Sequence, residues 1–313
     1  MTFFCETKGE GRSEHSGDEK RARAAQVGHY AYIMIPPAYA VYLLFVLAPV
    51  FAGLAFSFTN YDFYKKMDFV GLKNYIDLAH DAEFVRSVFN TLYYAFFTII
   101  PTLAIGVVLA VLVNKGIRGT KVFRTCMYVP NVGSMVALSM IWLWIFDPTV
   151  GFMNQIVTAL GLPAQQWLFN EATAMPCLII MGIWRSAGYN MVISLAGLQS
   201  IPNDLYEAAR IDGAGELKQF FAITLPMLRP TTFFLLVTGC INSFMVFEQV
   251  NIMTNGGPLN STTTIVHQIY KSAFLNFKAG YGSAMAMILL AMTIVFTLLN
   301  FRFANQDNGT DVN

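Results

Sequence analysis

The chain has 313 residues, of which 55% are hydrophobic and 12% are charged. This composition is too apolar for an ordinary soluble protein, and a formal net charge of +1 leaves no basic surface for a nucleic-acid partner. The sequence therefore predicts an all-α integral membrane protein.

The first residues of the chain, up to about residue 24, are polar and mixed in charge, and they lack the apolar segment of a cleavable signal peptide. We expect residues 1–28 to form a disordered cytoplasmic tail. A membrane domain is expected over residues 29–303, followed by a cytoplasmic C-terminal tail at 304–313.

Apolar stretches long enough to cross a membrane recur along the chain. A bilayer core about 30 Å thick requires about 20 helical residues. Six stretches meet this length: Ala31–Phe58, Thr91–Asn114, Cys126–Phe146, Thr173–Leu195, Thr231–Val250 and Ser283–Phe301. Because the first contains Pro36, Pro37 and Pro49, we expect it to be kinked or to begin along the membrane interface.

The distribution of Lys and Arg predicts the orientation of these spans, since positively charged loops remain in the cytoplasm. With the N-terminus inside, thirteen of the twenty Lys and Arg residues lie in the cytoplasm, six lie outside, and Arg185 lies within a span. The cluster from Lys115 to Arg124 contributes most to this asymmetry. Both termini are therefore predicted to be cytoplasmic.

Between the third and fourth stretches, apolar residues recur at helical spacing from Val150 to Leu160, with Gly151 near their start and Gly161 after them. This pattern predicts an amphipathic helix on the outer surface, where a soluble partner has a place to rest.

The fourth and fifth stretches contain polar side chains within apolar sequence. A polar solute needs such groups along its path, because they are costly to expose to lipid. The candidates for a substrate path are Trp184, Arg185, Ser186, Tyr189, Asn242 and Ser243. Arg185 has two interpretations: recognition of an anionic substrate, or a structural role in which its charged end reaches the membrane surface. Packing and inter-helix hydrogen bonding are the alternative for the others.

A charged segment separates the fourth stretch from the fifth. Pro202 suits a first helical turn, Asp204 complements the positive end of a helix, and Gly213 suits the left-handed residue that ends one. We expect a short helix from about Asn203 to Asp212. A second helical piece is expected from Glu216 to about Thr224, before Pro226 marks the entry to the next span.

Seven residues of this segment have a specific spacing. They are Glu207, Ala208, Ala209, Gly213, Ile223, Leu225 and Pro226. The spacing resembles the cytoplasmic EAA loop of binding-protein-dependent ABC importer permeases. Weaker matches, such as Gly71 to Tyr75 and Thr254 to Pro258, occur in the order found in the MalF-like subunits of carbohydrate and glycerol-phosphate importers.

This resemblance implies a type I ABC importer permease fold with six transmembrane helices, in a bacterial cytoplasmic membrane. It implies a heterodimer with a second permease subunit, two ATPase subunits below it and an extracytoplasmic solute-binding protein above it. The loop at about 200–229 would couple to the ATPases, and Trp184, Ser186, Tyr189 and Ser243 would line a sugar site. The sequence departs from the maltose-type pattern at Val246, where those subunits have an asparagine.

The predicted function is therefore transport without catalysis by this chain. No G-x-x-x-x-G-K-[ST] motif occurs, so ATP and Mg are expected to be used by the partner ATPases, and no cofactor is expected on this chain. The predicted substrate is a sugar, with glycerol phosphate or another anionic carbohydrate as the alternative. A stand-alone secondary transporter is a further alternative, although no ion-coupling carboxylate lies near the middle of a span. An intramembrane enzyme would need paired catalytic motifs that are absent from the sequence.

Overall fold

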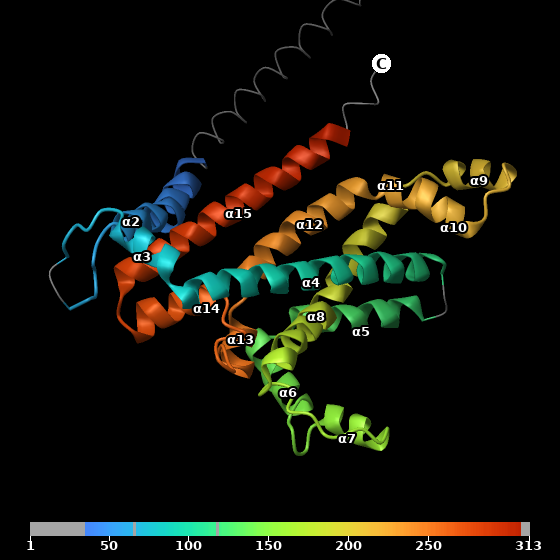
Figure 1. Cartoon of the computed structure of the whole chain (residues 1–313). Coiled ribbons are helices and arrows are strands. Elements are labelled where there is room, and N and C mark those ends of the chain that lie inside the picture. Colours follow the sequence, from blue (N-terminus) through green and yellow to red (C-terminus); the bar gives the residue numbers. More distant parts are fainter. Residues whose placement is uncertain (1–34, 65–66, 117–118, 308–313) are drawn as a thin grey trace, which may run out of the picture. The chain divides into compact units, whose positions relative to one another are not determined.

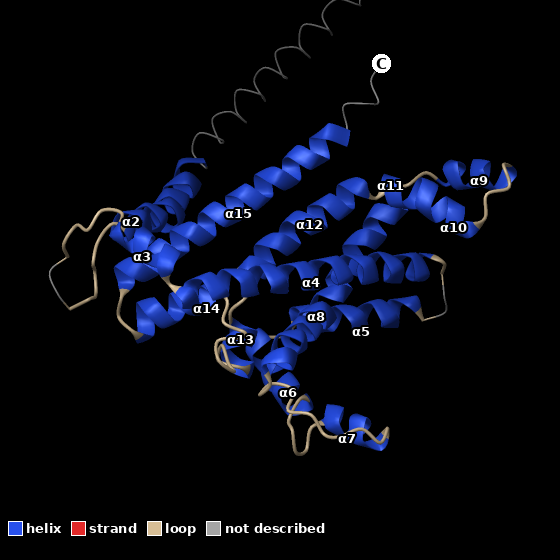
Figure 2. Cartoon of the chain, in the orientation of Figure 1, coloured by secondary structure: helices blue, strands red, loops and turns tan. Residues whose placement is uncertain are grey.

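The computed structural model describes residues 35–64, 67–116 and 119–307. Most of this part is helical, and it contains no strand beyond an isolated pairing of Thr59 with Phe69 (Figure 2). The chain divides into two compact units, Met1–Ala55 and Phe56–Asn313. The predicted N-terminal tail at 1–28 lies outside the described residues.

The first predicted span is helical from Ile35 to Ser57. It includes a π-helical turn, η1 (Leu43–Leu47), followed by α2 (Ala48–Ser57). Pro49 lies two residues after the π-turn, and the chain stays helical through Pro36, Pro37 and Pro49. The prolines therefore do not interrupt this helix.

In the larger unit, a short helix, α3 (Lys73–His80), precedes the long helix α4 (Ala82–Asn114). The Asp81 side chain caps α4 by accepting hydrogen bonds from the amides of Glu83 and Phe84, at 2.9 and 3.2 Å. Because of this cap, the helix begins well before the predicted start of the second span.

The third predicted span is not one straight helix. It consists of α5 (Thr120–Val132) and α6 (Met135–Ile145), whose axes differ by 101°. Gly133 between them has an extended backbone, with ψ 147°, which ends the hydrogen-bonding pattern of α5. Periodicity did not reveal this break because apolar residues continue on both sides of it.

The helix predicted between Val150 and Leu160 is confirmed as α7 (Phe152–Ala159). Gly161 follows it with φ +78°, a left-handed conformation that favours glycine. Asn154 holds the segment together. Its amide donates to the carbonyls of Pro148 and Gln165, both at 2.9 Å, and its oxygen accepts from the Trp167 ring nitrogen at 2.8 Å.

The fourth span, α8 (Glu171–Gln199), is packed against α4 and α5 (Figure 1). Leu178, Met181 and Met191 on this helix are fully buried. A membrane provides no strong hydrophobic force between helices, so close packing and hydrogen bonds carry this contact. Gly188 illustrates the closeness, since a β-carbon there would overlap the carbonyl oxygen of Met127 on α5.

The charged segment before the fifth span is helical as predicted. It contains α9 (Asn203–Ile211), α10 (Glu216–Gln219), the π-helical η2 (Phe220–Thr224) and α11 (Leu225–Met227). The fifth span itself is shorter than predicted. α12 (Arg229–Phe244) ends before an irregular turn, and a separate helix, α13 (Glu248–Met253), follows.

The chain then forms α14 (Ile265–Tyr270), a π-helical turn η3 (Lys271–Leu275), and the long helix α15 (Ala279–Asp307). α15 continues beyond the predicted boundary at residue 303. The described residues contain four helices long and apolar enough to cross a membrane, or up to six if each of two bent pairs counts as one span.

Candidate functional site

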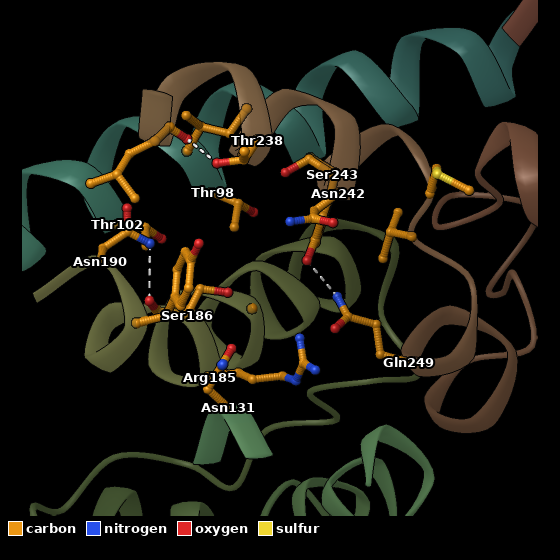
Figure 3. Close-up of a pocket in the computed structure, with 18 of the residues that line it drawn as sticks. Thr98, Thr102, Asn131, Arg185, Ser186, Asn190, Thr238, Asn242, Ser243 and Gln249 are labelled. Atoms are coloured by element: carbon orange, nitrogen blue, oxygen red, sulfur yellow. Dashed lines mark hydrogen bonds between the residues drawn. The ribbon is translucent and has the colours of Figure 1, made fainter. Parts of the chain in front are cut away.

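A cavity of about 540 Å³ lies among α4, α5, α6, α8, α12 and α13 of the larger unit. Polar side chains from all these elements except α6 reach it (Figure 3). Its polar and charged lining residues are Tyr94, Thr98, Thr102, Asn131, Arg185, Ser186, Tyr189, Asn190, Thr238, Asn242, Ser243, Glu248 and Gln249. Such a set between apolar helices provides a polar compartment at membrane depth.

Five of the six predicted path residues line this cavity: Arg185, Ser186, Tyr189, Asn242 and Ser243. Trp184 does not belong to its lining in the described chain. Its ring instead packs edge-on against Trp142 of α6, with ring centroids 5.5 Å apart. Successive residues of a helix point about 100° apart, so Trp184 and Arg185 face different surroundings.

Sequence reasoning missed the contribution of α4. Tyr94, Thr98 and Thr102 recur every four residues, so they form a polar stripe on one face of an otherwise apolar helix. That spacing was the available signal. Asn131 was also missed as a lining residue, because the break that brings the end of α5 to the cavity is not evident from composition.

Hydrogen bonds hold part of the lining in place. The Gln249 amide donates to the Tyr94 hydroxyl at 2.7 Å, which links α13 to α4. The Asn190 amide donates to the Ser186 carbonyl within α8 at 3.0 Å. The Gln249 and Asn190 contacts both appear in Figure 3. These contacts reduce the freedom of the cavity wall.

Other polar atoms of the cavity wall have no protein partner. Among the described residues, the hydroxyls of Thr98 and Thr102, the Nε atom of Arg185 and the Oε1 atom of Gln249 are buried without a hydrogen bond. Buried polar atoms nearly always have a partner, because an unmet one costs about 1–3 kcal/mol. Their concentration at one cavity favours a polar ligand or water there.

The N-terminal part of α4 is bonded to the segment that follows α13. The Asn90 amide donates to the carbonyls of Asn260 and Thr263 at 3.1 and 2.9 Å. The backbone amide of Ile265 donates to the Thr91 hydroxyl at 3.0 Å. The α13 helix, which carries Gln249 into the cavity, is thereby attached to α4 at this end.

His267 lies within the segment that is bonded to α4 and is only 4% exposed. Burial lowers the pKa of its imidazole, and the nearby charge of Lys271 lowers it further. The ring lies against Phe247, with centroids 6.4 Å apart. The described residues include no group of three or more His, Cys, Asp or Glu that could hold a metal ion.

The predicted coupling loop forms a compact turn at the far end of α12 from α13 (Figure 1). Gly213 has φ +76°, as predicted for a residue that ends a helix. The amide of Ala214 donates to the Ala209 carbonyl at 2.8 Å, and the amide of Gly213 donates to the Arg210 carbonyl at 3.0 Å. This pair of bonds is the Schellman arrangement of a helix end.

Side chains attach this loop to the membrane helices. The Lys115 ammonium at the end of α4 lies 2.8 Å from the Glu216 carboxylate. The hydroxyls of Tyr206 and Thr224 are 2.9 Å apart and join α9 to η2. The loop is therefore connected to α4 as well as to α8 and α12, which flank it in the chain.

The seven motif residues of the loop differ in exposure. Glu207, Ala208, Gly213 and Leu225 are exposed, whereas Ala209, Ile223 and Pro226 are half-buried. Large apolar side chains near them face outward, with Ile211 87% and Leu217 77% exposed. Exposed apolar groups of this kind are typical of a surface that binds another protein.

These features define a helical membrane protein with an internal polar cavity, and sequence comparison identifies its family. Residues 102–306 match the family described as "Binding-protein-dependent transport system inner membrane component". The chain belongs to this family and is an ABC transporter permease.

Individual relatives agree with this assignment. The chain is 36% identical over 277 residues to the "Probable ABC transporter permease protein YurN" of Bacillus subtilis (strain 168), covering 87% of this chain and 94% of that protein. It is 32% identical over 279 residues to the "sn-glycerol-3-phosphate transport system permease protein UgpA" of Yersinia enterocolitica serotype O:8 / biotype 1B (strain NCTC 13174 / 8081), covering 88% and 94%.

A solved structure shares the fold. It is a chain of a bacterial ABC transporter involved in the import of the acidic polysaccharide alginate, with a TM-score of 0.80 and 24% sequence identity. The match covers 92% of this chain and 99% of that chain. The overall helical fold is therefore one already seen in an ABC transporter.

Proposed function

We propose that this chain is one permease subunit of an ATP-driven, binding-protein-dependent importer that carries a carbohydrate across the bacterial cytoplasmic membrane. The carrying observation is the cavity, where buried polar atoms without protein partners gather between apolar helices. The names of the relatives also favour a carbohydrate or polyol cargo, since they refer to glycerol phosphate and alginate transport.

In this proposal the membrane domain covers residues 29–303 and crosses the bilayer six times, with cytoplasmic tails at 1–28 and 304–313. Each bent helix pair then counts as one span. The thirteen-to-six distribution of Lys and Arg supports a cytoplasmic location for both termini.

The proposed complex contains a second permease subunit, two ATPase subunits that use ATP and Mg, and a solute-binding protein outside. Glu207, Ala208, Ala209, Gly213, Ile223, Leu225 and Pro226 form the contact with an ATPase subunit. ATPase closure would move the loop at about 200–229, and its connections to α4, α8 and α12 would change the access to the cavity.

The substrate path in this proposal includes Arg185, Ser186, Tyr189, Asn242 and Ser243, with Trp184 beside it. Aromatic and hydroxyl groups suit a carbohydrate, because they contact its C–H surface and its hydroxyls. The neighbouring Thr98, Thr102 and Gln249 atoms add hydrogen-bonding capacity.

Reconstitution tests this function directly. The test uses liposomes that contain the chain, its second permease subunit and the ATPases, with the binding protein outside. We expect them to import a carbohydrate only when ATP is present inside, on the side of the ATPases. The chain alone should give no flux. Sustained substrate-specific flux by the chain alone would instead establish a stand-alone transporter.

A change at Gly213 tests the coupling loop. A β-carbon there would meet no atom within 4 Å, so a substitution acts only through the left-handed backbone. That conformation costs an ordinary residue about 1–2 kcal/mol, whereas asparagine tolerates it. We expect Gly213→Val to reduce uptake and binding-protein-stimulated ATP hydrolysis together, and Gly213→Asn to retain most of both. Equal activity of Gly213→Val and the parent would contradict the coupling role.

A further inference from the structure

Arg185 carries the only positive charge among the residues that line the cavity in the described chain. It lies within α8, far from both ends of that helix, where a charged side chain is costly unless it faces a polar compartment or a partner. Figure 3 shows its guanidinium extending along the cavity toward the side on which Gln249 lies.

The protein itself does not neutralise this guanidinium. Within the described residues, Arg185 forms no ion pair or hydrogen bond, and its buried Nε atom has no acceptor. Glu248 is the one carboxylate that lines the same cavity, and it is exposed and unpaired with Arg185. Arginine has five donors in a planar fork that matches a carboxylate or phosphate.

The other buried polar atoms of the cavity wall suit hydroxyls. The hydroxyls of Thr98 and Thr102 can donate or accept, and the Oε1 atom of Gln249 can only accept. All three are buried without a partner. One fixed cation, together with several buried polar atoms that have no hydrogen-bond partner, matches a polyhydroxylated anion better than a neutral sugar.

We propose that Arg185 is a specificity-determining residue that binds the carboxylate or phosphate of an anionic carbohydrate or polyol as it crosses the cavity. This inference rests on the proposed import function. The same chemistry belongs to two kinds of cargo, uronic-acid oligosaccharides and polyol phosphates.

Uptake by the complete importer separates these cargoes. We would reconstitute the permease with its second subunit, ATPases and binding protein, and supply radiolabelled digalacturonate, sn-glycerol 3-phosphate or sucrose. The wild-type importer should carry one of the two anions in preference to sucrose. Because a hydrogen bond between charged groups would be lost, Arg185→Gln should raise KM for that anion roughly ten- to hundredfold. Arg185→Lys should raise KM less, because it keeps the positive charge.

Arg86→Gln is the matched control. Arg86 also carries a positive charge, but it lies outside the cavity, and its contact with Glu171 at 3.4 Å joins two half-exposed side chains. We expect its KM to remain within about twofold of the parent, because exposed ion pairs contribute little. Thermal midpoints and co-purification of the second permease subunit should be unchanged for Arg185→Gln.

Three results would overturn the proposal. Import of sucrose alone would refute the anion preference while leaving the import function intact. Import of none of the three probes by the assembled complex would also refute the anion preference, whereas the import function itself is refuted by flux through the chain alone. The Arg185→Gln variant could also lose the second permease subunit while the complexes that stay intact keep the parent KM. That result would assign Arg185 to the contact between the two permease subunits instead.

Discussion

Replacing Gly188 with alanine should separate α8 from α5 and destabilise the protein. In the native packing, a β-carbon at this position would overlap the Met127 carbonyl oxygen and lie 2.9 Å from the Tyr128 amide nitrogen. Both atoms belong to the backbone of a helix, so no side-chain rotation relieves the overlap. The helices must move apart, and the packing around Asn190 in the cavity wall must change with them.

Two opposing terms set the size of this effect. Alanine is favoured over glycine within a helix by about 1 kcal/mol. Overpacking in a close-packed interior typically costs about 1–3 kcal/mol, and a backbone overlap belongs at or above the upper end of that range. The expected net destabilisation is therefore about 2 kcal/mol or more, and each kcal/mol lowers the unfolding midpoint by about 2–4 °C for a protein of a few hundred residues.

Gly239→Ala provides the matched control. Gly239 is also a helix glycine, on α12, but the nearest atoms to a β-carbon there are those of Ile99 at 3.6 Å, an ordinary contact. Thermal unfolding of the detergent-solubilised complex should show a lower midpoint for Gly188→Ala and an unchanged or higher midpoint for Gly239→Ala. Equal midpoints for the two variants would refute the argument from close approach.

Two further predictions concern the α7 segment and α14. Asn154→Ala removes the hydrogen bonds that hold the α7 segment and should destabilise that segment by roughly 2–4 kcal/mol, at about 1 kcal/mol per bond. Faster proteolysis and a red-shifted Trp167 emission would report this change. Gln155→Ala removes one exposed hydrogen bond and should have little effect. Burial lowers the pKa of the His267 imidazole, so the native state binds fewer protons than the unfolded state at acidic pH. The free energy of unfolding is therefore unaffected by this group above about pH 6.5 and decreases as the pH falls below that value. His267→Gln should flatten the fall in unfolding midpoint between pH 6.5 and 5, and an undiminished fall would contradict this assignment.

Much of the architecture could be predicted from local sequence. The long apolar runs predicted α4, α8 and α15, and the spacing around Gly213 predicted both the helix α9 and the left-handed residue that ends it. These features depend on composition, helix termini and glycine conformations, which act over a few residues. The motif spacing in the same segment also identified the family that the comparisons show.

The tertiary structure alone decided where the cavity lies and what lines it. The 101° bend at Gly133 and the end of α12 before α13 interrupt sequences that remain apolar, so periodicity passes over both. Whether a polar residue faces a cavity, a neighbouring helix or lipid depends on helix rotation and packing, which single-residue patterns leave open. Neighbouring Trp184 and Arg185 therefore received the same prediction, and the rotation of α8 gave them different surroundings.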